Sequence, residues 1–147
     1  MNPNYKALLI GLIYISSCTK DIHVANLKNN QLEFKGNQEE ILSRWNEAVK
    51  SHNLKGILDT LEVRRDSDTL NQVQYFYLLG RSSNDSLKMA QLLVKYKHKL
   101  YLKNDTILSC ICYDCPSAQP KMSFDNWGWY CESDDIIHCK KIIDLKF

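Results

Sequence analysis

Residues 73–80 read VQYFYLLG, and the fold class depends on how this segment is assigned. Aromatic and β-branched side chains suit a half-buried pleated surface, and Gly80 bounds the run. These features favour a strand. A helix is the alternative, because Leu70, Val73, Tyr77 and Gly80 also have the spacing of one helical face. We expect a strand here.

The sequence before this segment predicts two helices. Asn37 can cap the first, and Glu40 stands three residues later, as in a capping box. Four apolar side chains then follow at helical spacing: Ile41, Trp45, Ala48 and Val49. Asn53 can cap a second helix, whose apolar side chains again share one face: Leu54, Ile57, Leu58 and Leu61.

The sequence after this segment predicts one more helix and then strands. The helix runs from Leu87 to about His98, and its lysines are interpreted as a solvated face rather than a contact with anionic lipid. Strands are expected at 106–113, at 122–131 and in the alternating stretch 137–147. This order predicts an α+β fold, with N-terminal helices packed on a curved antiparallel sheet.

The order of elements resembles the nuclear-transport-factor-2-like fold, a cone of helices wrapped by a curved sheet. The stretches that carry the resemblance are 45–48, 53–61, 73–77, 88–96 and 125–134. The resemblance implies a cone-like fold but no particular reaction, because that fold hosts many functions. The alternative is a set of short helical-repeat hairpins over 64–93, followed by a small β region.

The composition is that of an ordinary globular protein. The chain has 147 residues, of which 44% are hydrophobic and 24% charged, and its formal net charge is +2. These values exclude a largely disordered chain and a polytopic membrane protein, and the length fits one domain. So small a net charge offers no strong field for nucleic acid, and no nucleic-acid partner is expected.

Residues 1–18 read MNPNYKALLIGLIYISSC and predict an export signal. A single lysine precedes the apolar run 7–15, which is too short to span a bilayer but has the length of a signal-peptide core. The segment 15–18 resembles the bacterial lipobox. That resemblance implies cleavage before Cys18 and acylation of its thiol and amine, which anchors a protein stably. The alternative is an ordinary secretory signal in which Cys18 is incidental.

The domain organisation follows from this signal. We expect a signal peptide at 1–17, a lipidated tether at 18–36 and a single α+β domain at 37–147. Thr19 follows the cysteine in place of aspartate, which by resemblance to enterobacterial sorting rules favours the outer membrane. The predicted location is therefore the bacterial cell envelope, on either the periplasmic or the surface face of that membrane.

Five cysteines remain once Cys18 is lipidated: Cys110, Cys112, Cys115, Cys131 and Cys139. Outside the cytoplasm their clustering predicts disulfide bonds. Cys110 and Cys112 are two apart on one expected strand and face the same side, which directs each to a different partner. We expect Cys110 or Cys112 to pair with Cys131 or Cys139, and Cys115 to be the odd thiol.

Metal binding and redox catalysis are alternative roles for these cysteines. Zinc would use Cys112 and Cys115 with His138 and Cys139, but Cys131, seven residues before His138, fits no standard second ligand pair. A redox pair of Cys112 and Cys115 needs a helix N-terminus to lower a thiol pKa, and Pro116 follows instead. Disulfides are favoured, and no metal or cofactor is expected.

No catalytic motif is recognisable, so an enzyme is disfavoured. The expected role is non-catalytic binding of a ligand or a partner. A ligand pocket would be lined by aromatic side chains: Trp45, Tyr75, Tyr77, Trp127 and Trp129. One alternative is an immunity-type lipoprotein that neutralises a toxin through an exposed acidic or aromatic patch. The other is a small enzyme with Glu132 or Asp134 buried beside His138.

Overall fold

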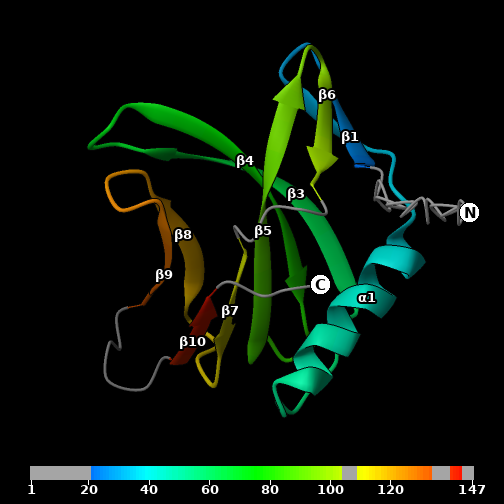
Figure 1. The fold of residues 1–147 in the computed structure, drawn as a ribbon, viewed down its shortest axis with the longest axis vertical. Helices are drawn as coiled ribbons and strands as arrows, with labels where there is room; N and C mark the ends of the chain where they lie inside the picture. Colours follow the sequence, from blue (N-terminus) through cyan, green and yellow to red (C-terminus); the bar gives the residue numbers. More distant parts are fainter. Residues whose placement is uncertain (1–20, 104–108, 134–139, 144–147) are drawn as a thin grey trace, which may run out of the picture.

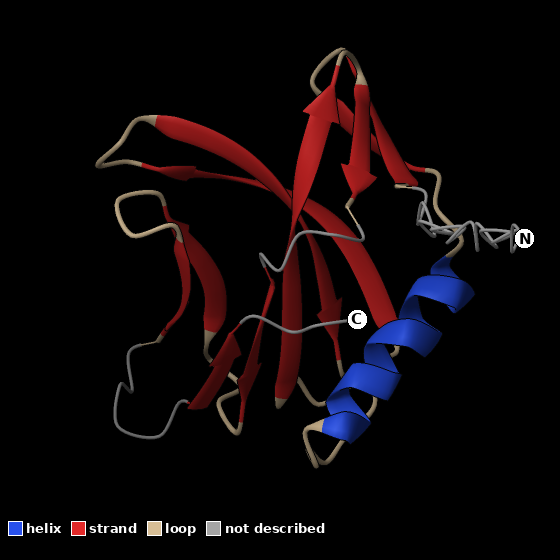
Figure 2. Cartoon of the chain, viewed as in Figure 1, coloured by secondary structure: helices blue, strands red, loops and turns tan. Residues whose placement is uncertain are grey.

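The computed structural model describes residues 21–103, 109–133 and 140–143. These residues contain one helix, α1 (Gln38–Ser51), and ten strands (Figures 1 and 2). The strands are β1 (Ile22–Lys28), β2 (Gln31–Phe34), β3 (Thr60–Asp68), β4 (Val73–Arg81), β5 (Leu87–Tyr96), β6 (Lys99–Leu102), β7 (Ser109–Tyr113), β8 (Gln119–Ser123), β9 (Gly128–Glu132) and β10 (Lys140–Ile143). The predicted signal peptide and Cys18 lie outside the described residues.

β5 is the central strand of the main sheet. One of its edges pairs antiparallel with β4 over Lys88–Leu93. The other edge is divided, because Leu87–Gln91 pair with β7 and Val94–Tyr96 pair with β6. The sheet therefore branches at β5, with β7 and β10 on one branch and β6, β1 and β2 on the other.

The strands β3, β4, β5, β6, β1 and β2 follow one another in a curved sheet that nearly closes into a barrel-like shape. Its two outer strands, β2 and β3, are in contact. The Arg65 guanidinium in β3 donates a hydrogen bond of 3.2 Å to the Asn30 carbonyl in the turn before β2. This contact shields strand edges that would otherwise be open to other chains.

The strand predicted at 73–80 is confirmed as β4, and both of its faces are buried. Phe76 and Leu78 belong to a core cluster that includes residues of α1. Tyr75, Tyr77 and Leu79 face the other way, into a cluster with residues of β8 and β9. The sheet is therefore covered by α1 on one side and by the β8–β9 hairpin on the other (Figure 1).

The first predicted helix is confirmed as α1. The Asn37 side chain accepts a hydrogen bond of 3.2 Å from the Glu40 amide, as the capping pattern predicts. The apolar stripe read from the spacing is the buried one: Ile41, Trp45, Ala48 and Val49. The indole of Trp45 lies against Gly80 of β4, where a Cβ atom would come within 3.0 Å of the ring. Glycine at this position allows the helix to pack closely.

The α+β prediction is wrong, because the described residues are mostly β with one helix. The second expected helix is a loop that leads into β3, and the third is β5 with its following turn. A strand covered on both faces shows a run of apolar residues in place of strict alternation, which hid β5. The helical-repeat alternative for 64–93 is also wrong, and the helical cone implied by the nuclear-transport-factor-2-like resemblance is not formed.

The tether predicted at 18–36 is wrong for the residues of β1 and β2. β1 lies between β2 and β6, and its consecutive residues Val24 and Ala25 are both fully buried. The register against β6 shifts between His23 and Ala25. A shift of this kind breaks the period-2 pattern. Alternation therefore could not reveal this strand in the sequence.

Candidate functional site

An open groove of about 570 Å³ lies between the β3–β4 hairpin and the β8–β9 hairpin. Figure 1 shows the two hairpins side by side, away from α1. The end of β3 and the turn after it form one wall, and β8, β9 and their turn form the other. Segments far apart in the sequence therefore build this groove together.

An aromatic cluster holds the β8–β9 hairpin against β4. The ring centroid of Trp129 lies 5.7 Å from that of Tyr77 and 6.4 Å from that of Tyr75, both edge to face. The Tyr75 hydroxyl oxygen accepts a hydrogen bond of 3.1 Å from the Met122 amide. Burial raises the pKa of Tyr75, so this hydroxyl stays protonated. The groove therefore has a packed apolar base beneath its polar walls.

Asp68 connects the tips of the two hairpins. Its carboxylate accepts hydrogen bonds of 2.9 Å from the Phe124 amide, 2.8 Å from the Asn71 side chain and 3.1 Å from the Leu70 amide. The first of these bonds crosses the groove from β3 to the β8–β9 turn. These donors, the Phe124 amide foremost, hold the pKa of Asp68 below its ordinary value of 3.8.

The open part of the groove is acidic. The Lys121 ammonium lies 2.6 Å from Asp66 and 3.9 Å from Glu132, and the hydrogen bond that it donates to the Asp66 carboxylate raises the pKa of Lys121. With Asp68, three carboxylates line the groove against this single ammonium. Burial raises the pKa of Tyr130, and the neighbouring Glu132 carboxylate raises it further. The groove therefore favours positive charge.

Exposed apolar side chains stand around this acidic groove. Leu70 on the β3–β4 turn is 86% exposed, and Tyr130 on β9 is 41% exposed. Both line the groove. Trp127 is 64% exposed in the β8–β9 turn, with its ring centroid 5.4 Å from that of Phe124. An exposed cluster of this kind, with a polar surrounding, is typical of an interaction surface.

The structure brings together only part of the predicted ligand pocket. Tyr75, Tyr77 and Trp129 form the cluster under the groove, but Trp127 is exposed. Trp45 lies elsewhere, on the buried face of α1 in the other core cluster, where it lines a cavity of about 20 Å³. A cavity of that size holds no more than about one water molecule. The five aromatic residues therefore do not line one pocket.

Sequence reasoning missed the charged residues of the groove. Asp66, Asp68 and Lys121 come from segments that carry no motif, and Asp66 is separated from Lys121 by 55 positions. Only pairing of the hairpins brings them together. The small-enzyme alternative required a buried carboxylate, whereas the Glu132 side chain is 59% exposed. Asp134 and His138 lie outside the described residues.

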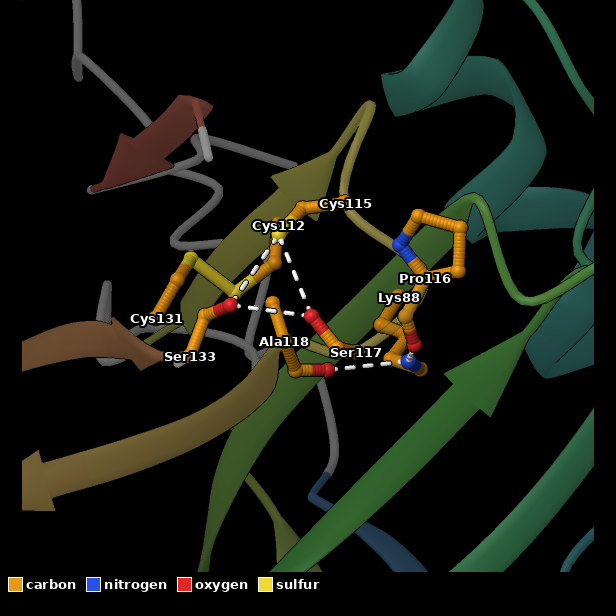
Figure 3. The surroundings of a disulfide bond; sticks show 8 residues. All are labelled: Lys88, Cys112, Cys115, Pro116, Ser117, Ala118, Cys131 and Ser133. Carbon is orange, nitrogen blue, oxygen red and sulfur yellow. Dashed lines mark hydrogen bonds between the residues drawn. A yellow bond between two sulfur atoms is a disulfide. The ribbon is translucent and has the colours of Figure 1, made fainter. Parts of the chain in front are cut away.

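A disulfide bond joins Cys112 of β7 to Cys131 of β9, with Cα atoms 5.8 Å apart (Figure 3). This pairing is among those expected from the sequence. Cys115 is itself disulfide-bonded, so the expectation that it is the odd thiol is wrong. The free cysteine among the described residues is Cys110, which is buried in β7. Cys139 lies outside the described residues.

This disulfide contradicts the zinc and redox alternatives. Both required Cys112 to act with Cys115, either as a thiolate ligand or as a redox partner, and Cys112 is instead bound to Cys131. Within the described ranges, no three histidine, cysteine or acidic residues gather closely enough to hold a metal ion. The bond between Cys112 and Cys131 therefore joins the β8–β9 hairpin to β7 of the main sheet.

Lys88 orders the loop beside the disulfide (Figure 3). Its side chain is 1% exposed, and its ammonium donates hydrogen bonds to the carbonyls of Pro116 and Ala118, the latter at 2.9 Å. Burial lowers the pKa of Lys88. Cys115 Sγ lies 3.4 Å from the Ser133 hydroxyl on the other side of this loop.

No protein-family model, curated protein or solved structure matches this chain. In the part of the chain that the structure describes, no helix is long and apolar enough to cross a membrane.

Proposed function

We propose that the chain is a non-catalytic binding protein of the bacterial cell envelope, lipid-anchored at Cys18, that holds a protein partner in the groove between the β3–β4 and β8–β9 hairpins. The observation that carries the proposal is an acidic groove lined by the exposed side chains of Leu70 and Tyr130, with Trp127 exposed in the β8–β9 turn. Aromatic side chains are enriched at protein interfaces, where they bury much area at little cost in conformational entropy.

The negative charge of the groove indicates that the partner binds through a basic side chain. Asp66 already pairs with Lys121, and Asp68 is saturated by backbone and side-chain donors. Glu132 is the most exposed carboxylate of the acidic part, and Tyr130 is beside it on the same face of β9. A lysine or arginine of the partner can pair with Glu132 while its aliphatic stem covers Tyr130.

Binding is favoured over catalysis because the titratable groups of the groove are engaged in structure. Asp68 joins the two hairpins, Lys121 bridges Asp66 and Glu132, and Tyr75 accepts from a backbone amide. An immunity-type protein that neutralises a toxin is expected to expose an acidic or an aromatic patch, and the acidic groove with exposed Tyr130 supports this role. That role is the most specific form of the proposal.

A displayed library of random peptides tests the groove. We expect the protein to enrich peptides that carry a basic residue next to an apolar one. Tyr130→Ala and Glu132→Lys should each weaken binding of the enriched peptides by about fivefold or more, since interface residues of this kind contribute more than about 1 kcal/mol. Glu47→Lys, at an exposed position on α1, is the matched control. Failure to enrich any peptide, or equal binding by all variants, contradicts the proposed site.

The anchor is tested separately, by the intact mass of the protein isolated from bacterial membranes. We expect a chain that begins at Cys18 and carries a diacylglycerol and an amide-linked acyl chain. Cys18→Ser should leave an unacylated chain. A wild-type chain that keeps residues 1–17 and carries no acyl group contradicts the lipid anchor but leaves the groove proposal standing.

A further inference from the structure

A second surface lies on β6 and the end of β5, which are neighbours in the sheet (Figure 1). It is a shallow hollow of about 330 Å³, lined in part by Val94, Tyr96 and Tyr101. Val94 is 38% exposed and Tyr96 is 64% exposed. Val94 pairs with Tyr101 across the β5–β6 ladder, so the strand register places these side chains on one face.

Lys95 lines this hollow, and three more exposed lysines lie at the hairpin turn and the strand end beside it. Lys95, Lys97 and Lys99 are exposed around the β5–β6 turn, and Lys28 is exposed at the end of β1. The Leu27 amide donates to the His98 carbonyl, which fixes the two turns next to each other. Among the described residues, none of these four lysines forms an ion pair.

We propose that this face, which we call the lysine face, rests on a membrane surface that contains anionic lipid. Exposed tyrosine and aliphatic side chains among lysines are typical of protein segments at the membrane–water interface. Each lysine near an anionic leaflet adds to the attraction. The sequence interpretation placed the lysines of 87–98 on a solvated helix face. The structure instead buries Lys88, and it places Lys95 and Lys97 at a hairpin turn beside the exposed ring of Tyr96.

The lysine face also lies where the chain enters the domain. Asp21 lines the same hollow, and its charge is paired with Lys103 at 3.6 Å. Cys18 precedes Asp21 by three residues, a span of at most about 11 Å in an extended chain. An acyl group on Cys18 would therefore enter the membrane beside this face. The position of the acyl group depends on the proposed lipid anchor at Cys18. The exposure of the lysines and of Tyr96 is independent of that anchor.

The test uses the full chain with Cys18→Ser, so that no acyl group contributes. Binding to vesicles of phosphatidylcholine is compared with binding to vesicles that also contain phosphatidylglycerol, at low and at high salt. The apolar run 7–15 is common to every variant and sets the background on neutral vesicles. We expect stronger binding to anionic vesicles, lost at high salt as screening predicts.

A triple variant, Lys95→Gln, Lys97→Gln and Lys99→Gln, isolates the lysine face. The ratio of the affinity for anionic vesicles to the affinity for neutral vesicles should fall on the order of a hundred-fold in this variant, since each lysine contributes about fivefold to it. The matched control changes three exposed lysines elsewhere: Lys50→Gln, Lys55→Gln and Lys141→Gln. Retention of the anionic preference by this control supports the proposal.

Three outcomes overturn the proposal. The first is equal binding to neutral and anionic vesicles. The second is a loss of anionic preference in the control variant as large as in the triple variant. The third is a concentration-dependent dimer that Tyr96→Ser abolishes, in a protein that shows no preference for anionic lipid. The last outcome assigns the face to a second copy of the chain. None of them affects peptide binding in the groove, which uses other residues, so failure here is distinguishable from failure of the proposed function.

Discussion

At the scale of single residues, Lys88 is a buried cation held by backbone carbonyls instead of a carboxylate. Its ammonium donates to Pro116 and Ala118 and so orders the loop between β7 and β8. Lys88→Met leaves both carbonyls without this donor, and buried groups left unpaired cost about 1–3 kcal/mol. We expect the free energy of unfolding in urea to fall by that amount.

Lys99→Met is the matched control for Lys88, because Lys99 is exposed at a hairpin turn. Surface substitutions of this kind change stability by no more than about 0.5 kcal/mol. Equal urea midpoints for the two variants would show that the carbonyl contacts of Lys88 contribute nothing to stability.

The lowered pKa of Asp68 should make the stability of the protein depend on pH. Its hydrogen bonds, the one from the Phe124 amide foremost, keep its pKa in the folded protein below 3.8. A carboxyl group with a lowered pKa stabilises the fold above its unfolded pKa, and this stability is lost as pH falls through the folded pKa. We expect Asp68→Asn to be less stable than wild type near neutral pH, with the difference shrinking below pH 3.8.

Urea unfolding from about pH 7 down to about pH 2 measures this difference. Asp59→Asn, at an exposed aspartate in the loop before β3, controls for removal of a negative charge. A wild-type minus Asp68→Asn difference that stays constant across this range contradicts the assignment.

At the scale of elements, the β8–β9 hairpin depends on the disulfide that joins it to β7. Cys112 and Cys131 are separated by 19 positions. A bridge that closes a loop of this size stabilises the folded state by about 3 kcal/mol, chiefly by restricting the unfolded chain. The double variant Cys112→Ser and Cys131→Ser should lose about this much, and peptide binding in the groove should weaken because one wall loses its covalent attachment.

The single variant Cys112→Ser is the comparison for this prediction, since it breaks the same bond with one substitution. Urea unfolding and peptide affinity are measured for both variants. An unchanged unfolding midpoint would show that the aromatic cluster and Asp68 hold the hairpin without the disulfide.

At the scale of the whole molecule, the free thiol of Cys110 reports on opening of the core. It is fully buried in β7, which pairs with the central strand β5, and burial raises the pKa of the thiol to about 12. A buried, protonated thiol is unreactive. We expect labelling of Cys110 by a thiol reagent only at the rate of global unfolding, as mapped by peptide mass spectrometry across urea concentrations. Labelling much faster than unfolding would instead reveal local opening of β7.

The whole fold was only partly predictable, and the reason is visible in particular elements. α1 was predicted because its cap and its apolar stripe are local signals, with Asn37 and Trp45 only a few residues apart. β4 was predicted from its aromatic and branched side chains. β5 was mistaken for a helix because α1 and the β8–β9 hairpin cover its two faces and remove the alternation.

The candidate site was harder to predict than the fold. Its aromatic base was partly foreseen, since Tyr75, Tyr77 and Trp129 were selected and lie together. The charged walls were not foreseen, because Asp66 meets Lys121 only after two hairpins distant in the sequence have packed. The exposure of Trp127 and the burial of Trp45 are likewise set by packing.

By itself, the sequence determined the features that depend on near neighbours: a capped first helix and a strand at 73–80. It also predicted that clustered cysteines form disulfides, but the structure decided that Cys112 pairs with Cys131. The tertiary structure decided which strands pair, where β1 and β2 enter the sheet, and how two hairpins enclose an acidic groove. The physical reason is the distance along the chain over which each interaction acts. Capping and side-chain preference act within one turn or strand, whereas pairing partners and the second covering face of a strand come from distant segments.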